Sequence, residues 1–182
     1  VPYHPDEIKM VADMNETVAG RHLDWRTVST ENCPVAGAMQ ILGEKWTLLI
    51  IRDAFNGIKR FDDFCGQTGA PRALVTSRLK YLVDEGVLYQ EPYQEPGSRS
   101  RLHYVLTRKG RDLQHVLIAL REWGDIHINE PDKQPIELIE KNSSVAVRLA
   151  LVRTDDNTLI EPINIRMQPG PGFCRRSSSA LR

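Results

Sequence analysis

The chain has 182 residues, of which 41% are hydrophobic, and its 24 Lys and Arg residues balance 24 Asp and Glu residues. This composition indicates a globular domain of ordinary size with appendages and excludes a fibrous or wholly disordered chain. No apolar run approaches the roughly 20 residues of a membrane-spanning helix, and residues 1–20 lack the pattern of a signal peptide. Three widely spaced cysteines form no disulfide framework, so we expect a reducing, cytoplasmic location and no membrane partner.

The first half of the chain predicts helices separated by glycine stops. Apolar residues at helical spacing predict a helix over 6–18, and the polar residues 20–32 follow as a linker. Pro34 is typical of the first turn of a second helix, which ends near Gly43. The run 46–55 is apolar on almost every side, which is typical of a central, buried helix.

Two more helices follow closely. A short one begins at Phe61 and ends between Gly66 and Gly69, and the next begins at Pro71 and ends at Gly86. Three aliphatic residues of the second helix share one face and are expected in the core: Val75, Leu79 and Leu82.

A hairpin and a long helix complete this region. The runs 87–93 and 102–106 have strand character, and the turn signal at 95–98 lies between them. Thr107 is a favourable N-cap for one long helix that continues to about Ile128. The apolar surface of that helix consists of Leu113, Val116, Leu117, Leu120 and Trp123.

The C-terminal part has a different pattern. Apolar residues alternate with others over 145–152 and again over 163–167, which is the period of a strand. Pro162 indicates a sheet edge or a bulge. We therefore expect an N-terminal helix and linker at 1–32, a main domain at 33–128, a small β-rich extension at 129–167 and a flexible tail at 168–182.

The order of these elements is that of a winged helix-turn-helix. The predicted fold class is mainly α with a small β part (α+β), extended by the small β appendage. In such a fold the second helix of the pair lies in the DNA major groove, and its N-terminal residues contact base edges. The expected partner is therefore a double-stranded DNA operator.

The neutral total charge hides an uneven distribution. Residues 72–111 carry eight Lys and Arg against four Asp and Glu, whereas 1–32 and 112–128 are net acidic. A local basic patch attracts a phosphate backbone. The alternative interpretation of these scattered charges is an ordinary solvated helix face.

Particular residues have expected roles on DNA. Arg72 can bond guanine with two N–H groups, and Thr76 can donate, accept or contact a thymine methyl. Lys80 lies farther along the same face and is expected on phosphate, whereas Arg99 and Arg101 at the hairpin tip are expected on the backbone or in a narrow minor groove. The alternative is that Arg72 and Arg101 only pair with surface acids. The candidate DNA-binding residues are Arg72, Ala73, Thr76, Ser77, Arg78, Lys80, Arg99 and Arg101.

Several separated motifs agree in order and spacing over residues 33–128: Cys33-Pro34-Val35, the run 42–53, Arg60-Phe61-Asp62-Asp63-Phe64, Arg78-Leu79, Tyr104-Val105-Leu106-Thr107, the run 109–113 and Trp123-Gly124-Asp125. Together these motifs resemble the HxlR-type (DUF24, MarR-like) transcriptional regulators.

The resemblance implies a homodimeric repressor or activator that binds an inverted-repeat operator. In such proteins the N-terminal helix and the long C-terminal helix form the dimer, which fits the apolar residues Leu113, Val116, Leu117, Leu120 and Trp123. The segment 1–32 is longer than is usual in the family. Some longer family members carry Cys pairs in the C-terminal extension, but this extension has none in its turns, so we expect no metal site and no cofactor.

The cysteines suggest a sensor. Cys33 precedes a predicted helix, whose dipole favours the reactive thiolate. The resemblance implies that a cysteine here senses hypochlorite, quinones, aldehydes or related electrophiles, and Cys174, beside Arg175, is a candidate resolving partner. The alternative for Cys33 is a small buried residue at the dimer core, and Cys65 is expected to be structural.

No enzyme pattern emerges, because the five histidines are scattered without metal-ligand spacing. Two alternatives to a cysteine-sensing regulator stay open. One is a winged helix that serves as a protein-interaction module, with the β extension as its docking surface. The other is a regulator that responds to a small-molecule inducer held near Trp46 or Trp123.

Overall fold

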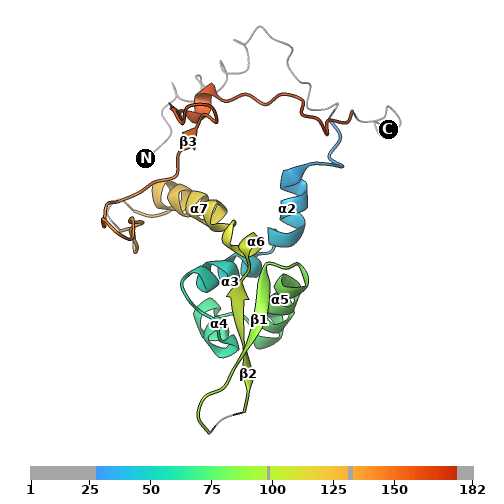
Figure 1. Ribbon diagram of the computed structural model, residues 1–182, viewed down its shortest axis with the longest axis vertical. Coiled ribbons are helices and arrows are strands. Elements are labelled where there is room, and N and C mark those ends of the chain that lie inside the picture. Colours follow the sequence, from blue (N-terminus) through green and yellow to red (C-terminus); the bar gives the residue numbers. More distant parts are fainter. Residues whose placement is uncertain (1–27, 98, 131–132, 176–182) are drawn as a thin grey trace. The chain divides into compact units, whose positions relative to one another are not determined.

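The computed structural model describes residues 28–97, 99–130 and 133–175 (Figure 1). The chain divides into two compact units, of which one runs from Pro34 to Gly124 and the other combines the residues before and after it. The helix predicted over 6–18 lies outside the described residues. No helix of the described part is long and apolar enough to cross a bilayer.

Four helices form the first part of the 34–124 unit, and their ends follow the predicted signals. Pro34 is the first residue of its helix, Gly43 follows the last, and Gly57, Gly69 and Gly86 have positive φ angles of 88°, 66° and 66°. These left-handed conformations are accessible to glycine without strain, so the helices end there. The helices are α2 (Pro34–Leu42), α3 (Lys45–Phe55), α4 (Phe61–Thr68) and α5 (Arg72–Asp84).

The core lies where α3, α4, α5 and the hairpin meet. Ile50 and Ile51 of α3 are completely buried, which confirms α3 as the central helix. The three predicted core residues of α5 are also completely buried, on the face opposite its polar residues. The fully buried apolar set is Ile50, Ile51, Phe64, Val75, Leu79, Leu82 and Val87, with Leu88 1% exposed.

The predicted hairpin is present and gains a third partner. Strands β1 (Leu88–Tyr93) and β2 (Arg101–Leu106) pair antiparallel, with Leu88 opposite Leu106 and Tyr93 opposite Arg101. The backbone N–H of Tyr104 donates to the carbonyl of Lys59 at 2.8 Å, and Arg60 forms a bridge with His103. The segment before α4 is thereby joined to the outer side of β2.

The prediction of a single long helix after Thr107 is wrong, because the structure has two helices there. Thr107 caps as expected, because its Oγ1 accepts from the N–H of Gly110 at 3.0 Å, but the helix is interrupted after one turn. The N–H of Leu113 bonds the carbonyl of Gly110, three residues back, which breaks the α-helical ladder. The two helices are α6 (Arg108–Arg111) and α7 (Gln114–His127).

The apolar residues predicted on the surface of this helix fall into a packed group and an exposed group. Leu113 and Leu117 pack against the core, whereas Val116, Leu120 and Trp123 are 42%, 49% and 57% exposed. Successive residues of a helix turn by about 100°, so Val116, Leu120 and Trp123 share one exposed face of α7, and Leu117 lies on the adjoining face that meets the core.

The C-terminal extension has much less β structure than the alternation predicted. Strands β3 (Leu151–Val152) and β4 (Leu159–Ile160) pair antiparallel, and Ile139 bridges Ala146. Pro162 starts a short 3₁₀ helix, η2 (Pro162–Asn164), instead of lying in an edge strand or bulge. None of the described side chains in 133–175 is buried, and an isolated two-stranded ribbon is marginally stable, so the strands stay short.

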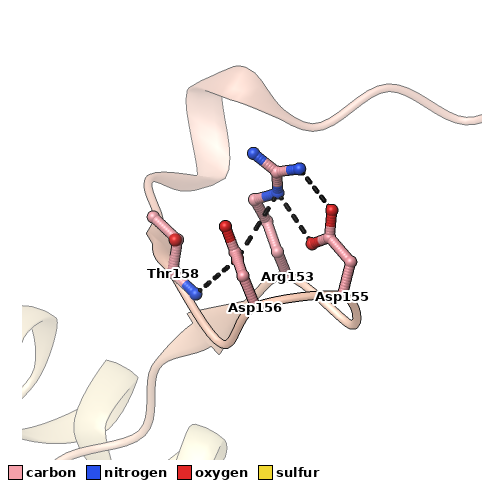
Figure 2. A network of polar contacts seen from close by, with 4 residues as sticks. All are labelled: Arg153, Asp155, Asp156 and Thr158. Atoms are coloured by element: carbon pink, nitrogen blue, oxygen red, sulfur yellow. Dashed lines mark hydrogen bonds and ion pairs between the residues drawn. The ribbon is translucent and has the colours of Figure 1, made fainter.

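Local polar contacts hold the turn between β3 and β4 (Figure 2). The Arg153 guanidinium bonds both oxygens of Asp155, at 3.0 Å from Nε and 2.5 Å from Nη2. Asp156 accepts from the N–H of Thr158 at 2.9 Å. The hydrogen bond from Arg153 lowers the pKa of Asp155 below its usual value, so the ion pair of this turn persists to a more acidic pH than an unpaired aspartate would allow.

We predict that Gly110→Ala destabilises the protein and that Gly66→Ala does not. A Cβ at 110 would lie 2.2 Å from the Val87 carbonyl oxygen and 2.9 Å from Leu106 Cδ2, and overpacking of this kind costs about 1–3 kcal/mol. A Cβ at Gly66, within α4, meets nothing within 4 Å and should gain about 0.5–1 kcal/mol from helix propensity. Urea unfolding measures both, and equal midpoints would contradict the packing described here.

Candidate nucleic-acid interface

The predicted recognition residues gather on one exposed face of α5. The turn from α4 is short, and its residue Ala70 is buried while Gly69 has the left-handed conformation. The face of α5 opposite its core residues is solvent-exposed and polar. It consists of Arg72, Ala73, Thr76, Ser77 and Lys80.

Both hydroxyl groups on this face already donate to the backbone of their own helix. Thr76 Oγ1 donates to the carbonyl of Arg72 at 2.9 Å, and Ser77 Oγ donates to that of Leu74 at 2.8 Å. With their protons used in this way, the two side chains present oxygen lone pairs and, for Thr76, a methyl group. In this state they match base-edge amino groups or a thymine methyl.

Arg72 at the start of α5 pairs with an acid of α4. Its Nη2 lies 2.8 Å from Asp62 Oδ1, and its guanidinium lies over the Phe61 ring at 4.7 Å. The hydrogen bond that Arg72 donates to Asp62 raises the pKa of Arg72. The two side chains are 66% and 62% exposed, and an ion pair so exposed contributes little to stability. The pair therefore does not hold Arg72 away from another anion.

Arg78 lies apart from the other candidates. Its side chain is only 25% exposed, and its Nη2 lies 3.7 Å from Glu44 Oε1, before α3. Its Nε is buried and has no hydrogen-bond partner among the described residues. The structure thus places Arg78 on the flank of α5 that faces the protein.

The hairpin tip carries Arg99 and Arg101, both exposed, the latter as the first residue of β2. Sequence reasoning missed a third cation beside them. Arg60 Nη2 lies 2.5 Å from Glu95 Oε1, and the hydrogen bond that Arg60 donates to Glu95 raises the pKa of Arg60. The residue was visible in the sequence only as a member of the Arg60–Phe64 motif.

An open groove joins these cations. It has a volume of about 540 Å³ and lies between the starts of α4 and α5 and the hairpin. Arg72 from α5 and both hairpin arginines contribute to it, so the structure brings three predicted contacts together there. The lining residues are Arg60, Phe61, Asp62, Asp63, Arg72, Tyr93, Arg99, Ser100, Arg101, Leu102 and Tyr104.

A second hollow of about 370 Å³ lies on another part of the same unit. Its walls come from the end of α3, from β2, from the end of α6 and from the start of α7, and they include neither Trp46 nor Trp123. A small molecule held in this hollow would contact Ala54, Phe55, Lys59, Tyr104, Val105, Leu106, Arg111 and Gln114.

Two of the three cysteines lie in the terminal unit, and there the chain returns close to Cys33. The N–H of Ser29 donates to the carbonyl of Cys174 at 2.9 Å, and Asn32 Nδ2 lies 3.8 Å from Cys174 Sγ. Cys33 is half-buried and Cys174 is exposed, whereas Cys65 packs against the core of the other unit. The described residues include no group of three His, Cys, Asp or Glu side chains that could hold a metal ion.

Comparison with known proteins agrees with this geometry. The HxlR-like helix-turn-helix family matches residues 41–132, which span α3 to α7 and both strands of the hairpin. The chain belongs to the HxlR-like helix-turn-helix family. This membership confirms the expected family and the winged-helix fold and makes the chain a DNA-binding transcriptional regulator of the helix-turn-helix type.

Relatives of this HxlR-like protein extend the similarity beyond the family region. The uncharacterized HTH-type transcriptional regulator Rv3095 of Mycobacterium tuberculosis is 36% identical over 146 residues, which are 80% of this chain and 91% of that protein. The crystal structure of PA1607, a putative transcription factor, matches with a TM-score of 0.67 and 34% identity over 77% of this chain and 96% of that one. The structure of PA1374 of Pseudomonas aeruginosa, also described as a putative transcription factor, matches with a TM-score of 0.54 and 33% identity. That match covers 81% of this chain and 97% of PA1374.

Proposed function

We propose that this HxlR-like protein binds an inverted-repeat operator as a homodimer, with α5 in the major groove and the hairpin tip on the neighbouring backbone. The observation that carries the proposal is the common groove, which Arg72 at the start of α5 shares with Arg99 and Arg101 of the hairpin. A helix start that faces base edges and a basic loop that faces phosphates are the two parts that a winged helix needs.

We predict that Arg72→Ala and Arg101→Ala weaken DNA binding in different ways. A duplex selected from a random library and a duplex of scrambled sequence are compared by fluorescence anisotropy between 50 and roughly 300 mM salt. Arg101→Ala should weaken both duplexes equally and reduce the log–log salt slope by about 0.9, the loss of one phosphate contact. Arg72→Ala should weaken the selected duplex about tenfold and the scrambled one much less, because a bidentate base contact carries specificity.

The exposed Arg148 of the C-terminal extension provides the matched control. Arg148→Ala removes the same charge and should leave both affinities unchanged. If Arg72→Ala and Arg101→Ala behave like this control, the assignment of α5 and the hairpin to DNA is wrong.

The proposed dimer uses the outward face of α7 with the apolar side chains of α2. Val116, Leu120 and Trp123 point away from the core, and Val35 and Met39 of α2 are 68% and 53% exposed. Exposed apolar surface of this kind marks a protein contact. A two-fold axis would place the two α5 helices about 34 Å apart, one turn of DNA.

We predict that Leu120→Asp converts the dimer to a monomer. A carboxylate at the centre of an apolar interface loses hydration without gaining a partner, while the exposed position leaves the core intact. His115→Asp, an exposed change on the same helix, is the control. Sedimentation velocity should show a dimer for the wild type and the control, and a wild-type monomer would contradict the proposal.

The proposed sensor is Cys33, with Cys174 as the resolving thiol. The contacts from Ser29 and Asn32 hold Cys174 beside the segment that leads to Cys33. Hydrogen peroxide would oxidise the Cys33 thiolate to a sulfenic acid and release hydroxide. The Cys174 thiol would then attack that sulfur, form the disulfide and release water.

We predict that peroxide or diamide lowers operator affinity only when Cys33 is present. Cys33→Ser should make binding insensitive to oxidant, and Cys174→Ser should leave a sulfenic acid that dimedone labels at Cys33. Cys65→Ser is the control and should respond like the wild type. Mass spectrometry of the oxidised protein identifies the disulfide, and unchanged affinity in the oxidised wild type would remove redox sensing.

A further inference from the structure

Arg60 lines the groove but is not one of the eight predicted DNA-binding residues. We propose that Arg60 binds a phosphodiester of the DNA backbone. In the absence of DNA, the Glu95 carboxylate binds the Arg60 guanidinium instead and so competes with the phosphate. The inference rests on the proposed function and adds one contact and one regulator of affinity to it.

The backbone fixes the position of Arg60. Its bridge to His103 and the hydrogen bond from Tyr104 to Lys59 tie the segment before α4 to β2. Arg60 therefore belongs to the hairpin side of the groove, where it lies among the lining residues together with Arg99 and Arg101. A cation fixed in this way does not depend on the hairpin loop for its place.

The ring of Tyr93 holds the Arg60 guanidinium independently of its acid partner. The group lies over the Tyr93 ring at 5.1 Å, and Tyr93 in turn stacks on His103, with centroids 3.7 Å apart and ring planes at 12°. An arginine over a ring face keeps its N–H groups free to bond an anion at its edge. Departure of Glu95 would thus leave the guanidinium in place.

The pair with Glu95 is weak enough to exchange. Arg60 and Glu95 are 46% and 51% exposed, and exposed ion pairs contribute little because water screens them. A DNA phosphate offers the same two-oxygen geometry to the guanidinium and also releases counterions when it is bound. Exchange of Glu95 for phosphate is therefore favourable, but the carboxylate reduces the net gain.

This competition lowers affinity for every DNA sequence equally. A phosphate contact carries no base information, so Glu95 weakens operator and random DNA by the same factor. Base contacts from α5 then account for a larger share of the binding free energy to the operator, while the ratio of the two affinities stays the same. Glu95 is in this sense a regulator of sequence-independent binding.

A double-mutant cycle on the full chain tests the proposal, with selected and scrambled duplexes as probes. Glu95→Gln should raise affinity about two- to fivefold for both duplexes, the scale of an exposed pair. Arg60→Gln should lower both affinities and reduce the salt slope by about 0.9. In the Arg60→Gln background, Glu95→Gln should have no further effect, because the group that it releases is absent.

Glu91→Gln is the matched control, since Glu91 is exposed on β1 opposite His103 and the change removes the same charge from the same hairpin. Glu91→Gln should change the DNA affinity by the same factor in the wild-type and the Arg60→Gln backgrounds. The proposal is overturned if Glu95→Gln raises affinity equally with and without Arg60, or if it lowers affinity because the pair merely holds the loop. Thermal melts of each variant verify folding. A wild type that binds neither duplex refutes the proposed function itself, whereas wild-type binding that is indifferent to Arg60→Gln refutes only this inference.

Discussion

The junction around Val87 is the constraint on which the rest of the 34–124 unit depends. The Val87 carbonyl accepts from the N–H of Thr107 at 3.0 Å, and Thr107 Oγ1 donates to the carbonyl of Gly86 at 2.7 Å. These bonds join the end of α5 to the start of α6 and close the base of the hairpin. Only a residue without a side chain fits between them at position 110, where the Val87 oxygen already occupies the space. The hairpin therefore leaves the core at a fixed point beside α5.

This junction explains how residues that are far apart in the sequence come to line one surface. The hairpin register puts Tyr93 and Arg101 at its outer end, and the segment at Arg60 pairs along its other side. Cations from three separate stretches of sequence, one of them the start of α5, then line one groove. Their electrostatic effect on a phosphate backbone is collective, although each arginine seen with an acid forms only an exposed pair.

The helices and the hairpin of the 34–124 unit were predictable because their signals are local. Gly69 and Gly86 end helices through their own backbone conformation, and the burial of Val75 and Leu79 follows from helical spacing. The break before α7 was missed because the apolar spacing from Leu113 to Leu120 is that of one continuous helix, whereas the N–H of Leu113 bonds the Gly110 carbonyl three residues back. Arg60 was missed because its partners Tyr93, Glu95 and His103 are distant in the sequence and meet it only through strand register. In the C-terminal extension, the alternating pattern predicted strands, but the described segment has no buried side chains to stabilise long ones.

The separation of the two faces of α5 has an evolutionary consequence. Val75, Leu79 and Leu82 carry its packing, whereas Arg72, Ala73 and Lys80 are exposed and add nothing to the core. Surface substitutions outside special contacts usually change stability by no more than about 0.5 kcal/mol. A duplicated copy of such a gene could exchange its outward residues one at a time without passing through an unfolded intermediate. Substitutions on the outward face of α5 could thus change the target sequence while its buried face keeps the fold constant.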